Sequence, residues 1–161
     1  MPVMTTLGWF HTVMGIIALL SGAYTLYQYK EIVFENRSGL IYLATTFITA
    51  ATALAIYQHG GFGPGHALAI FTLGALAVGT LAGSTDLSGS WGRYLRALSY
   101  TATLLFHSIP AVTDGLLRLP VGNPVLTSIQ DPVMRTTYLI LLVLFVVGVT
   151  LQLRWIHKQR N

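Results

Sequence analysis

The sequence predicts an all-α, polytopic transmembrane bundle of about five helices, with the N-terminus outside the cell and the C-terminus inside. The first observation is composition: 53% of the 161 residues are hydrophobic and only 9% are charged, whereas a soluble domain carries roughly 25% charged residues. The second is the order of the chain, in which long apolar runs alternate with short polar or Gly/Pro-rich segments. At roughly 20 residues per span, this length allows about five spans and no further domain.

The expected helices follow one another with short connections. The first ends at Lys30-Glu31, and a short polar loop leads to the second. The turn GGFGPG (60–65) leaves little room for an ordered loop before the third. The fourth is more polar and contains Pro110, and the fifth is the most apolar. We expect a single bundle over residues 1–161, with approximate spans 7–29, 39–58, 65–83, 93–118 and 133–155.

The basic residues predict the orientation. With five spans, seven of the nine Lys and Arg residues fall on the side of the first loop, the third loop and the C-terminal tail. Because basic residues mark the cytoplasmic side, that side is predicted to face inward. The start of the chain lacks a basic segment before its apolar run, so we expect a retained first helix rather than a cleaved signal peptide. The predicted location is the cytoplasmic (inner) membrane of a bacterium, as a multi-pass protein in contact with the lipid bilayer.

Composition also excludes several chemistries. The chain has no cysteine, which excludes disulfides, thiolate metal sites and iron–sulfur clusters. Its net charge of +4 comes from residues scattered at helix ends, which membrane topology explains better than nucleic-acid binding does. We therefore expect no nucleic-acid partner.

Histidines are the most informative residues of the chain. Threading the spans places His11, His59, His66 and His107 towards the outer side, with His107 the deepest and the turn pair His59/His66 the shallowest. Ionisable residues inside a bilayer are costly, and they mark a functional site by default. The fifth, His157, lies in the basic tail and is expected to be solvated.

The histidines lie on stripes typical of inward-facing helix surfaces. On the second helix Thr45, Thr49 and Thr52 share a face, and His59 lies seven residues beyond Thr52. His11 aligns with small residues at spacings of four, seven and eleven, which would let a neighbouring backbone or a flat cofactor approach. On the fourth helix the stripe is polar, and its last two members, at spacing four, are expected to form an ion pair. The members of the polar stripe are Tyr100, Thr103, His107, Asp114 and Arg118.

The leading functional hypothesis is a protein that binds haem b for electron transfer or redox chemistry. Histidine is a common axial ligand of haem iron. His11 and His107 are the expected ligands, and His66 or His59 would lie near the edge of the cofactor. Tyr100 and Thr103 would line or orient that site. A membrane redox partner or a homo-oligomer would then be expected.

Two alternatives remain open. Zinc or another divalent metal held by His11, His107, His66 and Asp114 would give a membrane hydrolase, although no HExxH motif supports it. Alternatively, the chain has no chemistry of its own and is a partner subunit of a membrane complex, with its histidines as interfacial groups bonded to water or backbone.

One part of the sequence resembles a known family. His11 with Gly15, the stretch NRSGLIYLATTFITAATAL and the turn GGFGPGH resemble the pattern of a family of predicted bacterial inner-membrane proteins of unknown function, over residues 10–77. Family members usually carry His-Arg before the second helix, where this chain has Asn36-Arg37, and a further histidine before the fourth helix, which this chain lacks. The resemblance implies a helical bundle and a role for His11 and His66. The arrangement also looks loosely like dihaem b-type cytochromes, but the one-sided histidines allow at most one haem.

Overall fold

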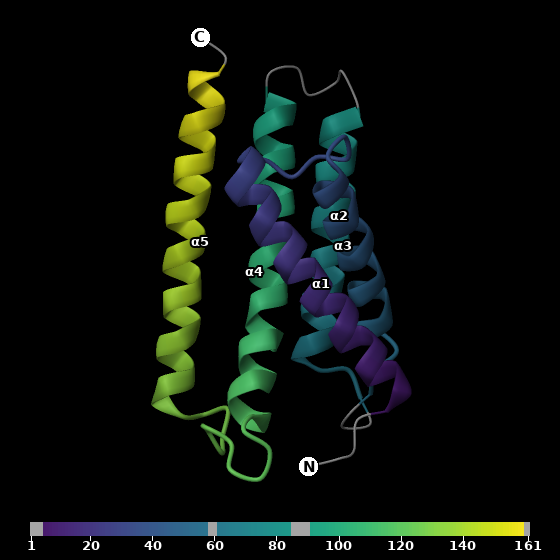
Figure 1. Ribbon diagram of the computed structural model, residues 1–161, viewed down its shortest axis with the longest axis vertical. Helices are drawn as coiled ribbons and strands as arrows, with labels where there is room; N and C mark the ends of the chain where they lie inside the picture. The colour runs from purple at the N-terminus through teal and green to yellow at the C-terminus, as the bar shows by residue number, and fades with distance from the viewer. Residues whose placement is uncertain (1–4, 58–60, 85–90, 160–161) are drawn as a thin grey trace.

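The computed structural model describes residues 5–57, 61–84 and 91–159. Within these residues the chain forms five α-helices, so the predicted all-α fold is confirmed. Figure 1 shows that the helices run up and down, and that α1 begins and α5 ends at opposite ends of the bundle. The helices are α1 (Thr6–Tyr29), α2 (Arg37–Ala53), α3 (Pro64–Ser84), α4 (Gly92–Arg118) and α5 (Pro132–Lys158).

Local signals explain where several helices begin. Thr5 caps α1 by accepting a hydrogen bond from the Gly8 amide at 3.1 Å. Asp131 caps α5 in the same way, through the Val133 amide at 2.8 Å. Both α3 and α5 begin with proline, which suits a first helical position because no helical hydrogen bond is lost there.

The largest difference from the predicted boundaries is at the end of α2. The helix was expected to run to Gln58, and it ends at Ala53. The amides of Ala55 and Ile56 bond to carbonyls three residues back, so the last turn tightens and the chain leaves the helix. The 17 residues of α2 span about 26 Å at about 1.5 Å per residue, which is slightly less than the roughly 30 Å of a bilayer's hydrocarbon core.

Within the described residues, three helices are long and apolar enough to cross a membrane: α1, α3 and α5. The other two carry polar residues that the bundle buries. On α2 these include Thr45, Thr46 and Thr49, and on α4 they include Thr103 and His107. Polar side chains therefore face the interior of the bundle, as expected for helices in lipid.

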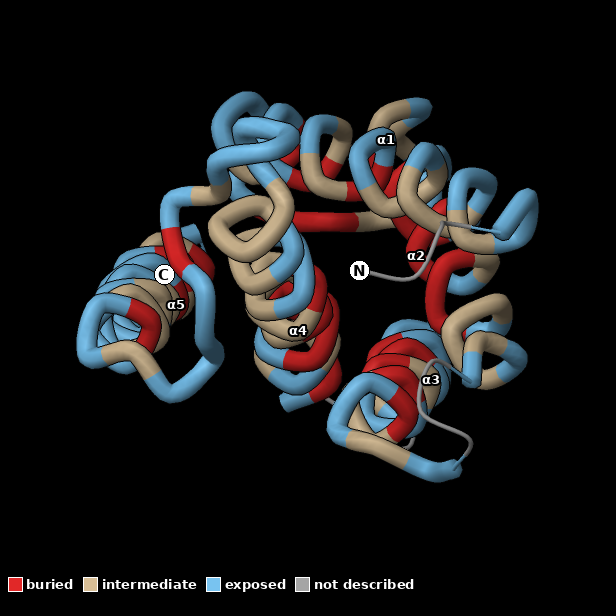
Figure 2. Tube along the Cα trace, turned by 90° about the horizontal axis from the view of Figure 1, so that it is seen from below, coloured by how far each residue is buried: buried red, intermediate tan, exposed pale blue. Residues whose placement is uncertain are grey.

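Helices α1 to α4 surround a common interior, while α5 lies outside them against α4 (Figure 2). Most of the apolar surface of α5 is exposed, which is the arrangement expected of a helix in contact with lipid. Its exposed apolar residues include Leu139, Ile140, Leu142, Val143, Leu144, Val146, Val147 and Leu151.

Two tyrosines form the centre of the core. Tyr42 is fully buried, and its hydroxyl lies 2.5 Å from Thr103 Oγ1. Tyr100 is also fully buried, and its hydroxyl lies 3.0 Å from Thr80 Oγ1. These bonds join α2 to α4 and α3 to α4, and they satisfy hydroxyls that would otherwise be unpaired away from water.

A charged cluster lies at the end of the bundle where α1 and α5 end. Glu31, directly after α1, is buried and accepts hydrogen bonds from Arg93, and Arg96 Nη2 lies 3.8 Å from its second oxygen. Gln152 of α5 accepts a hydrogen bond from Thr101 at 2.8 Å and donates one to the Lys30 carbonyl at 2.7 Å. These contacts fix α1, α4 and α5 to one another.

Close packing around Tyr42 predicts a sharp difference between two glycines. A Cβ at Gly22 would lie 2.6 Å from Tyr42 Cε2 and 3.0 Å from Leu104 Cδ1, whereas a Cβ at Gly74 of α3 would meet nothing within 4 Å. Gly22→Ala should therefore destabilise the fold by about 1–3 kcal/mol, while Gly74→Ala should be neutral or slightly stabilising. Thermal unfolding in detergent measures both. Equal effects of the two variants would show that α1 does not pack against Tyr42 in this way.

Candidate functional site

A cavity of about 550 Å³ lies among α1, α2, α3 and α4, at the end of the bundle where α1 and α3 begin. Residues 119 and 121, which follow α4, also line it. Small side chains from all of these helices make the room, and they give the cavity a largely apolar wall. The small lining residues are Gly15, Ala50, Ala53, Gly65, Ala69, Ala111 and Gly115.

His11 enters the cavity from the second turn of α1, with its orientation fixed by α2. Its Nδ1 lies 3.1 Å from the Thr49 carbonyl and 3.1 Å from Thr52 Oγ1. The Thr52 hydroxyl donates to the Ile48 carbonyl at 2.8 Å, so it is free to accept. Since a carbonyl only accepts, we assign the ring proton to Nδ1. The lone pair of His11 is then on Nε2, the atom away from α2.

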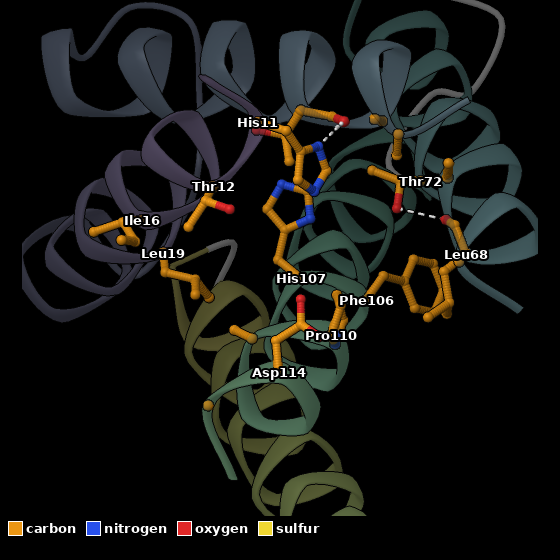
Figure 3. A pocket seen from close by; sticks show the side chains of 18 of the residues that line it. His11, Thr12, Ile16, Leu19, Leu68, Thr72, Phe106, His107, Pro110 and Asp114 are labelled. Carbon is orange, nitrogen blue, oxygen red and sulfur yellow. Dashed lines mark hydrogen bonds between the residues drawn. The ribbon is translucent and has the colours of Figure 1, made fainter. Parts of the chain in front are cut away.

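His107 enters the same cavity from α4, and Figure 3 shows its ring beside that of His11, with the two rings turned towards one another. The residue is only 7% exposed. Its Nε2 is buried and has no hydrogen-bond partner in the part of the chain that the structure describes. An unsatisfied buried polar atom costs about 1–3 kcal/mol. Five side chains of the described residues carry such an atom, His66 Nε2 among them, and His107 is the one of the five that lines the cavity.

Asp114 and Arg118 line the cavity further along α4, on the side of the helix that carries His107. Arg118 Nε donates to Asp114 Oδ1 at 3.3 Å, which confirms the predicted ion pair. The Asp114 side chain is 61% exposed and that of Arg118 is 24% exposed. The pair therefore stands at the outer, more open part of the cavity.

His66 does not line this cavity, although it lies at the same end of the bundle. Its Nδ1 accepts a hydrogen bond from the Gly63 amide at 3.1 Å, across the start of α3. Its ring stacks against Phe62 at 5.0 Å and lies 4.8 Å from the ring of Tyr57, centroid to centroid. These contacts make His66 a packing residue of the turn. His59, the other expected turn histidine, lies outside the described residues.

Tyr100 and Thr103, expected to line or orient the site, lie in the core around Tyr42 and not in the wall of the cavity. His157 is exposed at the other end of the bundle, where its Nδ1 lies 3.4 Å from the Tyr94 hydroxyl. Of the candidate ligands, the structure brings together His11 and His107, with Asp114 beyond them.

A three-ligand metal site is not formed by these residues. The described residues contain no group of three or more His, Cys, Asp or Glu side chains that could hold a metal ion. The His66 ring is hydrogen-bonded to the Gly63 amide at the start of its own helix, and Asp114 is paired with Arg118. The arrangement is a pair of facing imidazoles in an apolar cavity.

Sequence reasoning missed the partners of His11. Thr49 and Thr52 share a helix face in the sequence, but helical spacing placed His59 on that face. Because α2 ends at Ala53, this helix face is shorter than the sequence pattern assumed, and the two threonines meet His11 of the neighbouring α1. Helical spacing predicts a shared face but not the helix opposite it.

Comparisons with known proteins add no assignment: no protein family, curated protein or solved structure matches the chain. The resemblance to predicted bacterial inner-membrane proteins therefore stays a prediction.

Proposed function

We propose that this protein binds one haem b in the cavity between α1 and α4, with His11 and His107 as the axial ligands, and that it transfers electrons in the cytoplasmic membrane. The observation that carries the proposal is the pair of facing imidazoles. His11 has its proton held on Nδ1 by the Thr49 carbonyl, and His107 has a buried Nε2 without a partner.

The bond to Thr49 is the kind of contact that prepares a histidine to bind a metal. Metal-ligating histidines usually donate their second ring N–H to a carbonyl or carboxylate, which fixes the tautomer and orients the ring. His11 has this arrangement, with Thr52 as a further contact. His107 offers the opposing nitrogen, and the small residues around both rings leave space for a flat, apolar group.

The number of ligands favours haem over zinc. Catalytic zinc takes three protein ligands and keeps one position for water. Haem iron already has four ring nitrogens and needs only one or two axial ligands from the protein. The two histidines match the second requirement, and no third ligand joins them among the described residues. This observation does not favour the zinc hydrolase.

Two axial histidines also favour electron transfer over oxygen chemistry. If His11 and His107 both held the iron, no position would be left for a small molecule to bind it. Electrons would then pass through the edge of the macrocycle to a membrane redox partner. A partner subunit without a cofactor remains the competing hypothesis, and the colour of the purified protein separates the two.

The haem proposal predicts the spectrum of the wild-type protein and of three variants. Purified from haem-replete cells, the wild type should have a Soret band that sharpens and shifts on dithionite reduction. His107→Ala and His11→Ala should lose the low-spin spectrum, because each removes one axial ligand. His157→Ala, a histidine exposed at the other end of the bundle, should keep it.

A rescue experiment separates ligand loss from misfolding. Added imidazole should restore the low-spin spectrum of a His107→Gly variant, because the cavity can admit the free ligand. A wild-type protein that stays colourless after reconstitution with haem would overturn the proposal. Stoichiometric zinc in that preparation would revive the hydrolase, and a metal-free protein that co-purifies with a membrane complex would support the partner subunit.

The inner-membrane location has a separate test. Because most Lys and Arg residues lie at the end opposite the cavity, that end should face the cytoplasm. A reporter fused after residue 161 should be active as a cytoplasmic fusion, and one inserted between α4 and α5 should be active only as a periplasmic insertion. The reversed pattern would place the cavity at the cytoplasmic face.

A further inference from the structure

We infer that Arg118 binds the carboxylate groups at the edge of the cavity's occupant, exchanging its contact with Asp114 for them. The inference rests on the proposed function, in which the occupant is haem b and the carboxylates are its two propionates. It assigns a binding role to a residue that the sequence pattern placed only in an internal ion pair.

Arg118 belongs to the face of α4 that lines the cavity. From His107 onwards, the cavity-lining residues of α4 form one continuous stripe along its face: His107, Pro110, Ala111, Asp114, Gly115 and Arg118. Helical side chains point back towards the N-terminus of their helix, and the bond from Arg118 Nε to Asp114 shows this direction. The guanidinium therefore lies near the level of Asp114, about 10 Å along the axis from His107. That is the scale separating haem iron from its propionate carboxylates.

Arg118 also carries the positive charge that suits a carboxylate. Among the cavity-lining residues that the structure describes, Arg118 is the only Lys or Arg. The rest of the wall is mainly apolar, apart from the histidines, Asp114 and a few threonines. An amphipathic occupant would place its apolar body between the histidines and its anionic edge at the arginine. The reverse orientation would bury carboxylates in an apolar wall, which is strongly unfavourable.

Arg118 makes little use of its hydrogen-bond donors within the described residues. A guanidinium has five N–H donors in a rigid fork that suits carboxylates. In the described part of the chain Arg118 uses one of them, in a single 3.3 Å bond from Nε. Asp114 is mostly exposed, so water can hydrate its carboxylate when the arginine turns away. The exchange would replace one long bond by a bidentate, charge-assisted pair.

The test compares two forms of the cofactor on two forms of the protein. Apo-protein in detergent is titrated with haem b and with its dimethyl ester, which has no free carboxylate, and the Soret change gives each Kd. Arg118→Gln should weaken haem b binding by about tenfold to a hundredfold and leave binding of the ester unchanged. Arg118→Lys, which keeps the charge without the fork, should give an intermediate loss for haem b.

Two further variants serve as controls. Arg135→Gln removes an exposed arginine at the same end of the bundle, near the start of α5 and away from the cavity, and should change neither Kd. Asp114→Asn removes the competitor for Arg118, and should leave haem b binding as strong as in the wild type or strengthen it.

The outcomes distinguish this inference from the proposed function. If haem b binds and Arg118→Gln changes neither Kd, the role of Arg118 is overturned while the haem site stands. Equal weakening for haem b and its ester would also overturn it, because the arginine would then act only on the fold. If neither cofactor binds the wild type, the haem proposal fails and this inference fails with it.

Discussion

The arrangement of the helices depends most on the ion pairs that the buried carboxylate of Glu31 forms with two arginines. Glu31 lies directly after α1 and is bound by Arg93 and Arg96 from the first turns of α4. Removing one partner from a partly buried cluster of this kind costs far more folding free energy than removing one partner of a surface ion pair. Arg93 also lies over the ring of Trp155 of α5, at 5.5 Å from its centroid. The cluster thus ties α1, α4 and α5 together at the end opposite the cavity.

Glycine serves opposite purposes in the two halves of the bundle. Near the core, tyrosine rings fill the space beside Gly22 and Gly79, so the absence of a Cβ permits close packing of α1 and α3. Towards the cavity, a Cβ at Gly65 or Gly115 would meet nothing within 4 Å, although both residues line the cavity wall. Glycine at these two positions enlarges the cavity and does not serve close packing against a neighbouring side chain. The bundle is therefore held closely in one half and left open in the other, which is where the two histidines face each other.

The sequence predicted the fold well, because apolar runs, polar loops and Gly/Pro turns each act over a few residues. It also selected His11 and His107 as a pair, because both lie on helix faces unlike a lipid-facing surface. Periodicity could not say which helices are neighbours, so the sequence missed the contact of Thr49 and Thr52 with His11. For the same reason Tyr100 was expected near the site, whereas its ring packs beside Gly79 in the core. The orientation of the His66 ring depends on its contacts with Phe62 and Tyr57, which helical spacing does not describe.

The energetics of the cavity argue for an occupant of definite chemistry. An apolar cavity alone would accept a lipid chain or any hydrophobic molecule of suitable size. The wall of this cavity, however, contains His107 Nε2, buried without a partner in the described structure, and a hydrocarbon would leave that penalty in place. An occupant that accepts a lone pair from each imidazole would remove this penalty. It would also bind the Nε2 lone pair of His11, which the bond from Nδ1 to the Thr49 carbonyl leaves free. The proposed haem b, a metal in a flat, apolar macrocycle, would meet both requirements, whereas a hydrated ion would leave the apolar wall in contact with water.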